Sequence, residues 1–228
     1  MSTKKTTQDS RACPSRGQVT RERIIGAAKI VFSRQPYHSA SIRMIATQGK
    51  FEHGIIRYHF PSKAILFKTI VQEICRDIED ANHAWLAQTA RMPAKAALEF
   101  YLDKLFVFYD ERPEALKIIA LNLPQDGSQE TIPGYEHIIQ MLHCTRLSLA
   151  KNLPPQTPPD LVLRFLDAFN ALVLHYLGAS YCQAKVLGLP PKSKEYKEWV
   201  KDTMVLVFTP MMRTVYQAGR DAAGQIGR

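Results

Sequence analysis

Apolar residues recur every three or four positions along most of this 228-residue chain. That spacing places them on one face of an α-helix, whereas a half-buried strand requires alternation at every second position. The sequence contains no alternating run flanked by hairpin turns and no internal repeat. The pattern predicts an all-α fold, with a head of short helices at the N-terminus and a body of long helices behind it.

Turn-forming and capping residues divide the pattern into segments. Four prolines between residues 154 and 159 predict a stiff connector, and Pro210 should bend the last segment. Ser39 and Ser41 are alternative N-caps for the second segment, and Ser62 is one for the fourth. The segments expected to be helical are residues 20–33, 41–49, 52–59, 62–90, 93–109, 113–122, 135–152, 160–187 and 193–218.

The net charge of +9 is concentrated at the N-terminus. Residues 1–63 hold twelve of the 30 lysines and arginines but only three of the 21 acids, whereas residues 64–228 are balanced. Such a distribution predicts a polyanionic partner, either nucleic acid or an anionic membrane surface. The sequence contains no run of about 18 uninterrupted apolar residues, so no membrane span is predicted. Residues 1–17 lack the apolar core of a secretory signal and are expected to form a flexible basic arm.

Two short predicted helices separated by one tight turn lie within residues 41–59. Their apolar residues suit the inside of a helix-turn-helix, and the polar residues of the second helix are left to face outward. A second helix of this kind enters the major groove of DNA with its N-terminal residues against base edges. Arg57 suits either a bidentate contact with guanine or a phosphate. A three-helix DNA-binding head is therefore predicted for residues 18–63.

A longer motif surrounds this pair. It reads IA-xx-G-x-FE-x-G-x-I-x-YHF-x-SK-xx-L from Ile45 to Leu66, preceded by II-x-AA-xxx-F from Ile24 to Phe32. Over about residues 20–67 this motif resembles the DNA-binding region of TetR-family transcriptional regulators. Beyond that region the resemblance is one of architecture: long helices, with two strongly apolar ones last.

Two departures from the family pattern bear on the head. Lys50 stands where those proteins usually have glycine, so either Lys50 holds a left-handed backbone at a cost of about 1 kcal/mol or Gly49 takes that role. Arg57 stands where they usually have tyrosine, and Tyr58 follows it. Either residue is therefore a candidate for the usual tyrosine–phosphate contact.

The resemblance implies roles for individual residues of the head. Residues 52–54 would lie at the base-reading end of the recognition helix, and residues 58 and 59 would lie near the sugar-phosphate backbone. Lys63, at the start of the fourth helix, would bind phosphate. The predicted contacts with double-stranded DNA are Ser41, Arg43, Glu52, His53, Gly54, Arg57, Tyr58, His59 and Lys63.

The resemblance also implies a homodimer and a small-molecule effector. Residues 160–187 are apolar almost all round, and together with residues 193–218 they exceed what one small body can cover. Pairing with a second copy gives a four-helix interface, and effector binding would favour a head spacing that releases DNA. Aromatic residues of the body either line the effector pocket or form ordinary core. The pocket candidates are Trp85, Tyr101, Phe108, Phe165, Phe169 and His175.

Other chemistry has little support in the sequence. The four cysteines stand far apart without a CxxC pair, so neither a zinc ribbon nor a disulfide framework is expected. Cys75 and Cys182 are expected to be small buried hydrophobes, and Cys144 is a candidate redox switch. His137 and His143 do not share one helix face with Cys144, so no metal site is expected. No GxSxG, P-loop or GxGxxG motif occurs, so no catalytic residue and no cofactor is assigned.

Three functions remain open at this point. The first is a cytoplasmic, ligand-responsive DNA-binding regulator, most readily a repressor. The second is an all-α ligand-binding protein or enzyme whose basic head is incidental. The third is an adaptor that binds an anionic membrane surface through its head. Salt-dependent binding to one promoter, lost in Arg57 and Lys63 variants, separates the first from the others.

Overall fold

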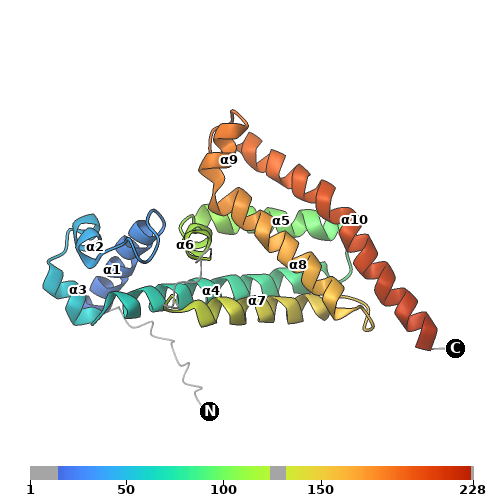
Figure 1. The fold of residues 1–228 in the computed structure, drawn as a ribbon, viewed down its shortest axis with the longest axis horizontal. Helices are drawn as coiled ribbons and strands as arrows, with labels where there is room; N and C mark the ends of the chain where they lie inside the picture. Colours follow the sequence, from blue (N-terminus) through green and yellow to red (C-terminus); the bar gives the residue numbers. More distant parts are fainter. Residues whose placement is uncertain (1–14, 124–131, 227–228) are drawn as a thin grey trace, which may run out of the picture.

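The computed structural model describes residues 15–123 and 132–226, and over these ranges it contains helices and no strand, as predicted. The head, α1–α3, lies at one end of an elongated molecule (Figure 1). The long helix α4 leaves the head and packs along α7, while α10 packs against α5 and α8. The helices are α1 Arg16–Phe32, α2 Ile42–Gly49, α3 His53–His59, α4 Lys63–Thr89, α5 Ala94–Glu111, α6 Ala115–Asn122, α7 Tyr135–Ala150, α8 Pro159–Val173, the π-helix η1 Leu174–Gly178, α9 Ser180–Val186 and α10 Lys194–Ile226.

The first helix begins four residues earlier than expected. Ser15 Oγ accepts a hydrogen bond from Gln18 N at 3.2 Å, and Ser15 N donates to Gln18 Oε1 at 2.8 Å. This reciprocal capping box provides hydrogen-bond acceptors for the backbone N–H groups of Ser15 and Gln18 at the helix start. Residues 15–17, predicted as part of a flexible arm, are therefore the cap and first turn of α1. The rest of the predicted arm lies outside the described residues.

The turn of the helix-turn-helix separates the roles of its two central residues. Lys50 adopts the left-handed backbone, with φ +54° and ψ +47°, directly after α2. Gly49 is required for a different reason, since a Cβ there would collide with the Phe51 ring and lie 3.0 Å from Ala27 Cβ on α1. Of the two open alternatives, Lys50 carries the strained conformation.

Lys50→Gly is expected to raise the free energy of unfolding by about 1 kcal/mol, because glycine holds positive φ without the Cβ clash. Urea denaturation measures the change. Gln48→Gly, at an exposed position inside α2, is the matched control and should lower stability by about 1 kcal/mol. A Lys50→Gly protein that is less stable than the parent would contradict this account of the turn.

The buried residues form two clusters. The first runs without a break from the head through α4 to α6 and α7, and includes Ile24, Ile56, Phe67 and Ile118. The second fills the body between α5, α8 and α10. Residues on both sides of the expected domain boundary at 63/64 share the first cluster, so the head and the start of the body are packed into one continuous core.

The single helix expected over residues 160–187 is interrupted, and that prediction was wrong. The chain forms α8, then the π-helical turn η1, where Ala179 N donates to Leu174 O at 3.2 Å, and then the separate α9. Gly178 permits this because its backbone lies against α6. By length and composition the segment Pro159–Gly178 could cross a membrane, although no span was expected. Core helices pass the same test, and here α8 packs against α7 and α10.

The cysteines divide differently from expectation. Cys75 is buried, as predicted, and burial raises the pKa of its thiol to about 12. Cys182 is exposed, so its predicted burial was wrong; it lies on α9, beyond the break. The Glu79 carboxylate beside Cys144 raises the pKa of that thiol. Since the thiolate is the reactive form, this surrounding disfavours a redox role for Cys144.

Candidate nucleic-acid interface and ligand cavity

The recognition helix α3 has one buried and one exposed side. Ile56 is fully buried on the side of α3 that packs against α2, as the helical period requires. Around it, five of the predicted contact residues are exposed: Glu52, His53, Gly54, Arg57 and Tyr58. Tyr58 is 84% exposed, and its ring meets His59, which is half-buried, edge-on at 5.2 Å.

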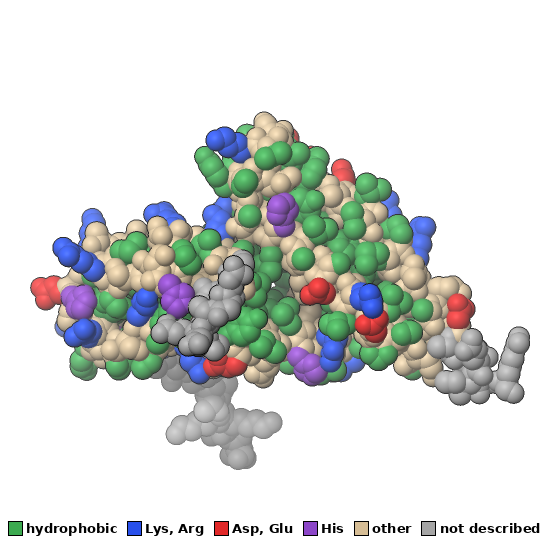
Figure 2. All heavy atoms as spheres, in the orientation of Figure 1, with side chains coloured by type: hydrophobic (Ala, Val, Ile, Leu, Met, Phe, Trp, Pro, Cys, Tyr) green, Lys and Arg blue, Asp and Glu red, His purple; other side chains and the backbone are tan. Residues whose placement is uncertain are grey.

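The preceding helix and the general charge of the head add to this surface. Arg43 is exposed on α2, while Ser41 is also exposed but uses its Oγ to cap α2 by accepting from Met44 N at 3.2 Å. Met44 and Ile55 leave 38% and 39% of their surfaces exposed beside these polar groups, which apolar periodicity could not distinguish from core positions. Figure 2 shows lysine and arginine side chains spread over the side of the head that is in view.

Lys63 is placed differently from the other predicted DNA contacts. Its Nζ donates to Tyr37 O at 2.8 Å and to Ala40 O at 2.9 Å, and it lies 4.3 Å from the centre of the Tyr37 ring. Partial burial lowers the pKa of its ammonium. Lys63 is the first residue of α4, where a positive charge opposes the helix dipole, and the two carbonyls offset that cost. The side chain thus ties α4 to the loop between α1 and α2.

A residue of the body also forms a hydrogen bond with the loop between α1 and α2. Asn122, at the end of α6, is 3% exposed; its Oδ1 accepts from Tyr37 N at 2.9 Å and its Nδ2 donates to Ile118 O at 2.8 Å. Its amide therefore connects the head loop to α6 while satisfying its own buried groups. Nothing in the local sequence around Asn122 indicated this contact.

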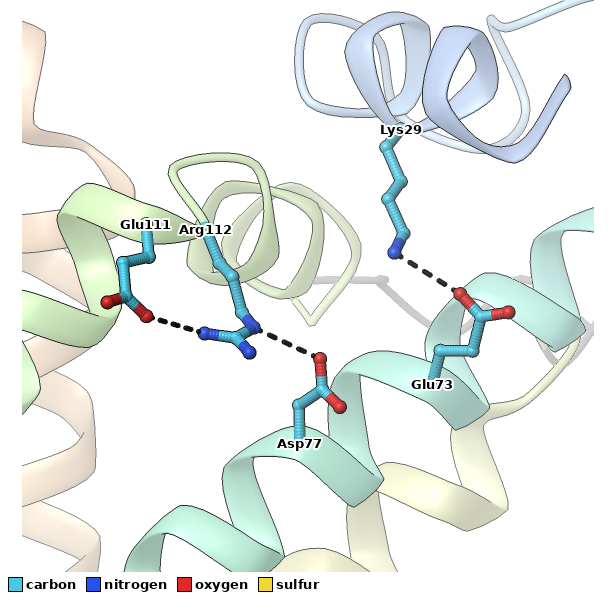
Figure 3. A network of polar contacts seen from close by, with 5 residues as sticks. All are labelled: Lys29, Glu73, Asp77, Glu111 and Arg112. Carbon is cyan, nitrogen blue, oxygen red and sulfur yellow. Dashed lines mark hydrogen bonds and ion pairs between the residues drawn. The ribbon is translucent and has the colours of Figure 1, made fainter. Parts of the chain in front are cut away.

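Ion pairs join the head and the start of the body along α4 (Figure 3). Lys29 of α1 lies 3.2 Å from Glu73 of α4. Arg112, after α5, lies 3.2 Å from Asp77 of α4 and 3.0 Å from Glu111. These pairs are partly exposed, so each contributes modestly to stability, but they fix the direction of α4 relative to its neighbours.

A cavity of about 500 Å³ lies in the body between α4, α5, α6, α7 and the α8–η1 segment. Its lining includes Trp85, Tyr101, Phe108, Phe169 and His175, five of the six residues predicted for an effector pocket. The sixth, Phe165, lies outside this cavity. Its ring stacks on Phe169 at 6.1 Å and meets Phe208 edge-on at 5.6 Å, and it lines a second, smaller cavity of about 50 Å³ together with Tyr101 and Phe169.

Polar groups enter the cavity at two places, and sequence reasoning identified only Tyr101 and His175 among them. Inside, Tyr101 Oη donates to Asn82 Oδ1 at 2.6 Å, and Asn82 Nδ2 donates to Thr145 Oγ1 at 3.0 Å. Burial raises the pKa of Tyr101, so its phenol stays protonated. At the mouth, Asp167 and His175 are both exposed and both line the cavity. Single polar residues on helix faces give no signal of this kind in a sequence.

An exposed recognition helix joined to a helical body that encloses an apolar cavity defines a class: helix-turn-helix proteins with a separate ligand-binding body. The comparison with protein families is more specific. Residues 24–70 match the model of bacterial regulatory proteins of the tetR family, so the head of this chain is similar to the N-terminal domain of that family.

Individual relatives extend the comparison. The transcriptional regulator UidR of Escherichia coli K12 is 39% identical over 54 residues, which cover 24% of this chain and 28% of that protein. A tetR-family regulator from Streptomyces coelicolor superposes with a TM-score of 0.58 at 16% identity, over 90% of this chain and 89% of that one. FadR of Bacillus subtilis, in complex with stearoyl-CoA, superposes with a TM-score of 0.57 at 16% identity, over 81% and 97%. The family-model match thus covers most of the head and the first residues of α4, whereas the similarity over the body is one of fold.

Proposed function

We propose that this chain is a ligand-responsive transcriptional regulator, most readily a repressor that leaves its operator when a small molecule enters the cavity. The observation that carries the proposal is the exposed face of α3, where Arg57 and Tyr58 point away from the core that Ile56 enters. We assign DNA binding to residues 18–63, and effector binding and dimerisation to residues 64–228. Because its partner is DNA, we place the protein in the cytoplasm.

The surface of the head supports both base and backbone contacts. Arg57 forms no ion pair within the described part of the chain, so its guanidinium is available for guanine or phosphate. Ile55 and Met44 offer exposed apolar surface that suits thymine methyl groups. Tyr58 and Arg43 are placed for the sugar-phosphate backbone. Lys63 is proposed to act chiefly by positioning α4, with at most one N–H left for a phosphate.

Arg57→Ala is expected to weaken binding to the preferred operator by roughly tenfold, and to relax the preference at one position in each half-site. The operator is first obtained by selection from random DNA duplexes with the full-length protein, and affinities are then measured at several salt concentrations. Arg91→Ala, in the turn that follows the end of α4 far from the head, is the control and should leave affinity unchanged. Equal losses on selected and random DNA would show that Arg57 contacts phosphate only, and a selection that enriches no sequence would refute the proposed function.

We propose that two copies pair through α8, α9 and α10. The support is apolar surface on these helices: Leu163 is 47% exposed, Val186 75% and Leu206 76%. Large exposed apolar groups gathered on neighbouring elements are typical of an interface. A symmetric dimer reads an inverted repeat, so the selected operator should contain two related half-sites.

The cavity and the head share one helix, which supports release by an effector. Leu116, Ile119 and Ala120 of α6 line the cavity, and Asn122 at the end of the same helix holds the head loop. A molecule that displaces α6 therefore also displaces the loop between α1 and α2, which contains Tyr37. The stearoyl-CoA bound by FadR of Bacillus subtilis supports a ligand role for a body of this fold.

A further inference from the structure

The charge of the cavity lining is one-sided. Among its described residues there is no lysine and no arginine, and Asp167 supplies the one carboxylate. Asp167 is exposed on α8 at the mouth, and it takes part in none of the ion pairs of the described chain. His175 also lines the cavity and lies in η1, the segment that follows α8, with Nε2 3.2 Å from Gln183 Oε1. Among the described residues of the lining, a ligand that enters here meets one unpaired negative charge and no fixed positive charge.

The interior is aromatic and internally satisfied. The Trp85 ring meets Tyr101 edge-on at 5.5 Å and Phe108 at 6.0 Å, and Tyr101 meets Phe169 at 5.6 Å. Ring faces carry partial negative charge and favour both apolar groups and cations. The side chains of Tyr101, Asn82 and Thr145 are hydrogen-bonded to one another. None of the three is ionised, so they place no charge in the cavity.

We propose that the effector is a lipophilic cation, with a ring-bearing apolar body inside the cavity and an ammonium group at the mouth beside Asp167. This inference rests on the proposed function, in which the cavity is the effector site. An anion of the same size would lose part of its hydration next to a carboxylate without meeting a counter-charge. A neutral molecule would fill the aromatic interior but gain nothing from Asp167.

Three probes with one carbon skeleton test the charge: 4-phenylbutylamine, 4-phenylbutan-1-ol and 4-phenylbutyrate. The chain has two tryptophans, and Trp199 packs against Tyr176 rather than in the cavity, so a Trp199→Phe protein reports binding through Trp85 alone. We expect the amine to bind about fivefold more tightly than the alcohol, and the carboxylate at least fivefold more weakly, as for a partly exposed charge pair. Calorimetry on the unchanged full-length chain provides a second measurement.

Asp167→Asn should lower the affinity for the amine to that for the alcohol and leave the alcohol unchanged. Asp160→Asn is the matched control, because Asp160 lies on the same helix but pairs with Arg164 and does not line the cavity. Equal binding of the three probes, tightest binding of the carboxylate, or an amine preference that survives Asp167→Asn would each overturn the inference. A protein that still selects an operator in that case keeps the proposed function and loses only this ligand class.

Discussion

Replacement of Gly178 by valine is expected to lower the free energy of unfolding by about 2–3 kcal/mol, because it forces α6 away from η1. A Cβ at Gly178 would lie 2.6 Å from Ala120 Cβ and 3.1 Å from Leu116 O. The second of these atoms is backbone, so no side-chain rotation relieves the overlap. Since Leu116 and Ala120 line the cavity, the affinity for 4-phenylbutylamine should change together with stability.

Urea denaturation and the Trp85 titration measure the two effects of Gly178→Val. Gly26→Ala is the matched control, because Gly26 is exposed within α1 and has no heavy atom within 4 Å of a built Cβ. That change should raise stability by up to about 1 kcal/mol, as glycine is a poor helix former. If Gly178→Val is as stable as the parent, the close approach of α6 and η1 does not constrain the body.

Lys63→Met is expected to lower the free energy of unfolding by about 2 kcal/mol in the absence of DNA, and to weaken DNA binding at least roughly tenfold. Methionine keeps an unbranched stem of the same length as the lysine stem but lacks the ammonium, leaving the carbonyls of Tyr37 and Ala40 without this donor. The start of α4 would then be released from the loop between α1 and α2.

Two readouts separate this positioning role from a simple phosphate contact. If Lys63 only binds phosphate, Lys63→Met loses affinity for all sequences alike and unfolds at the same urea concentration as the parent. Lys68→Met is the control, since Lys68 forms an exposed ion pair with Glu136 at 2.6 Å and its loss should cost well under about 1 kcal/mol. A stable Lys63→Met protein would restore the phosphate interpretation.

Gly178 and Lys63 lie at two ends of one connected path. Gly178 packs against Ala120 of α6, and Asn122 of the same helix binds Tyr37 N. Lys63 binds the carbonyl of that same Tyr37. Because α6 also lines the cavity, both variants should alter how strongly ligand and DNA affect each other's binding.

The order of helices and the chemistry of the head were already present in the amino-acid sequence, because both depend on residues close together in the chain. Helical period selected the inward-facing Ile24 and Ile56, and Ser41 and Ser62 cap the helices that follow them. The left-handed backbone at Lys50 was one of two alternatives that the sequence left open, the other being Gly49, because Lys50 stands where related proteins usually have glycine. The capping box at Ser15 is equally local, since it joins residues only three positions apart.

Contacts between distant residues decided the rest. Lys63 bonds to residues 23 and 26 positions away, and Asn122 bonds to one 85 positions away, so no local pattern specifies them. The break between η1 and α9 depends on how closely α6 approaches Gly178. The acidic mouth of the cavity exists only because Asp167 is brought near rings from α4 and α5. Period and capping act within a few residues, whereas a cavity and its charge arise from the packing of several helices.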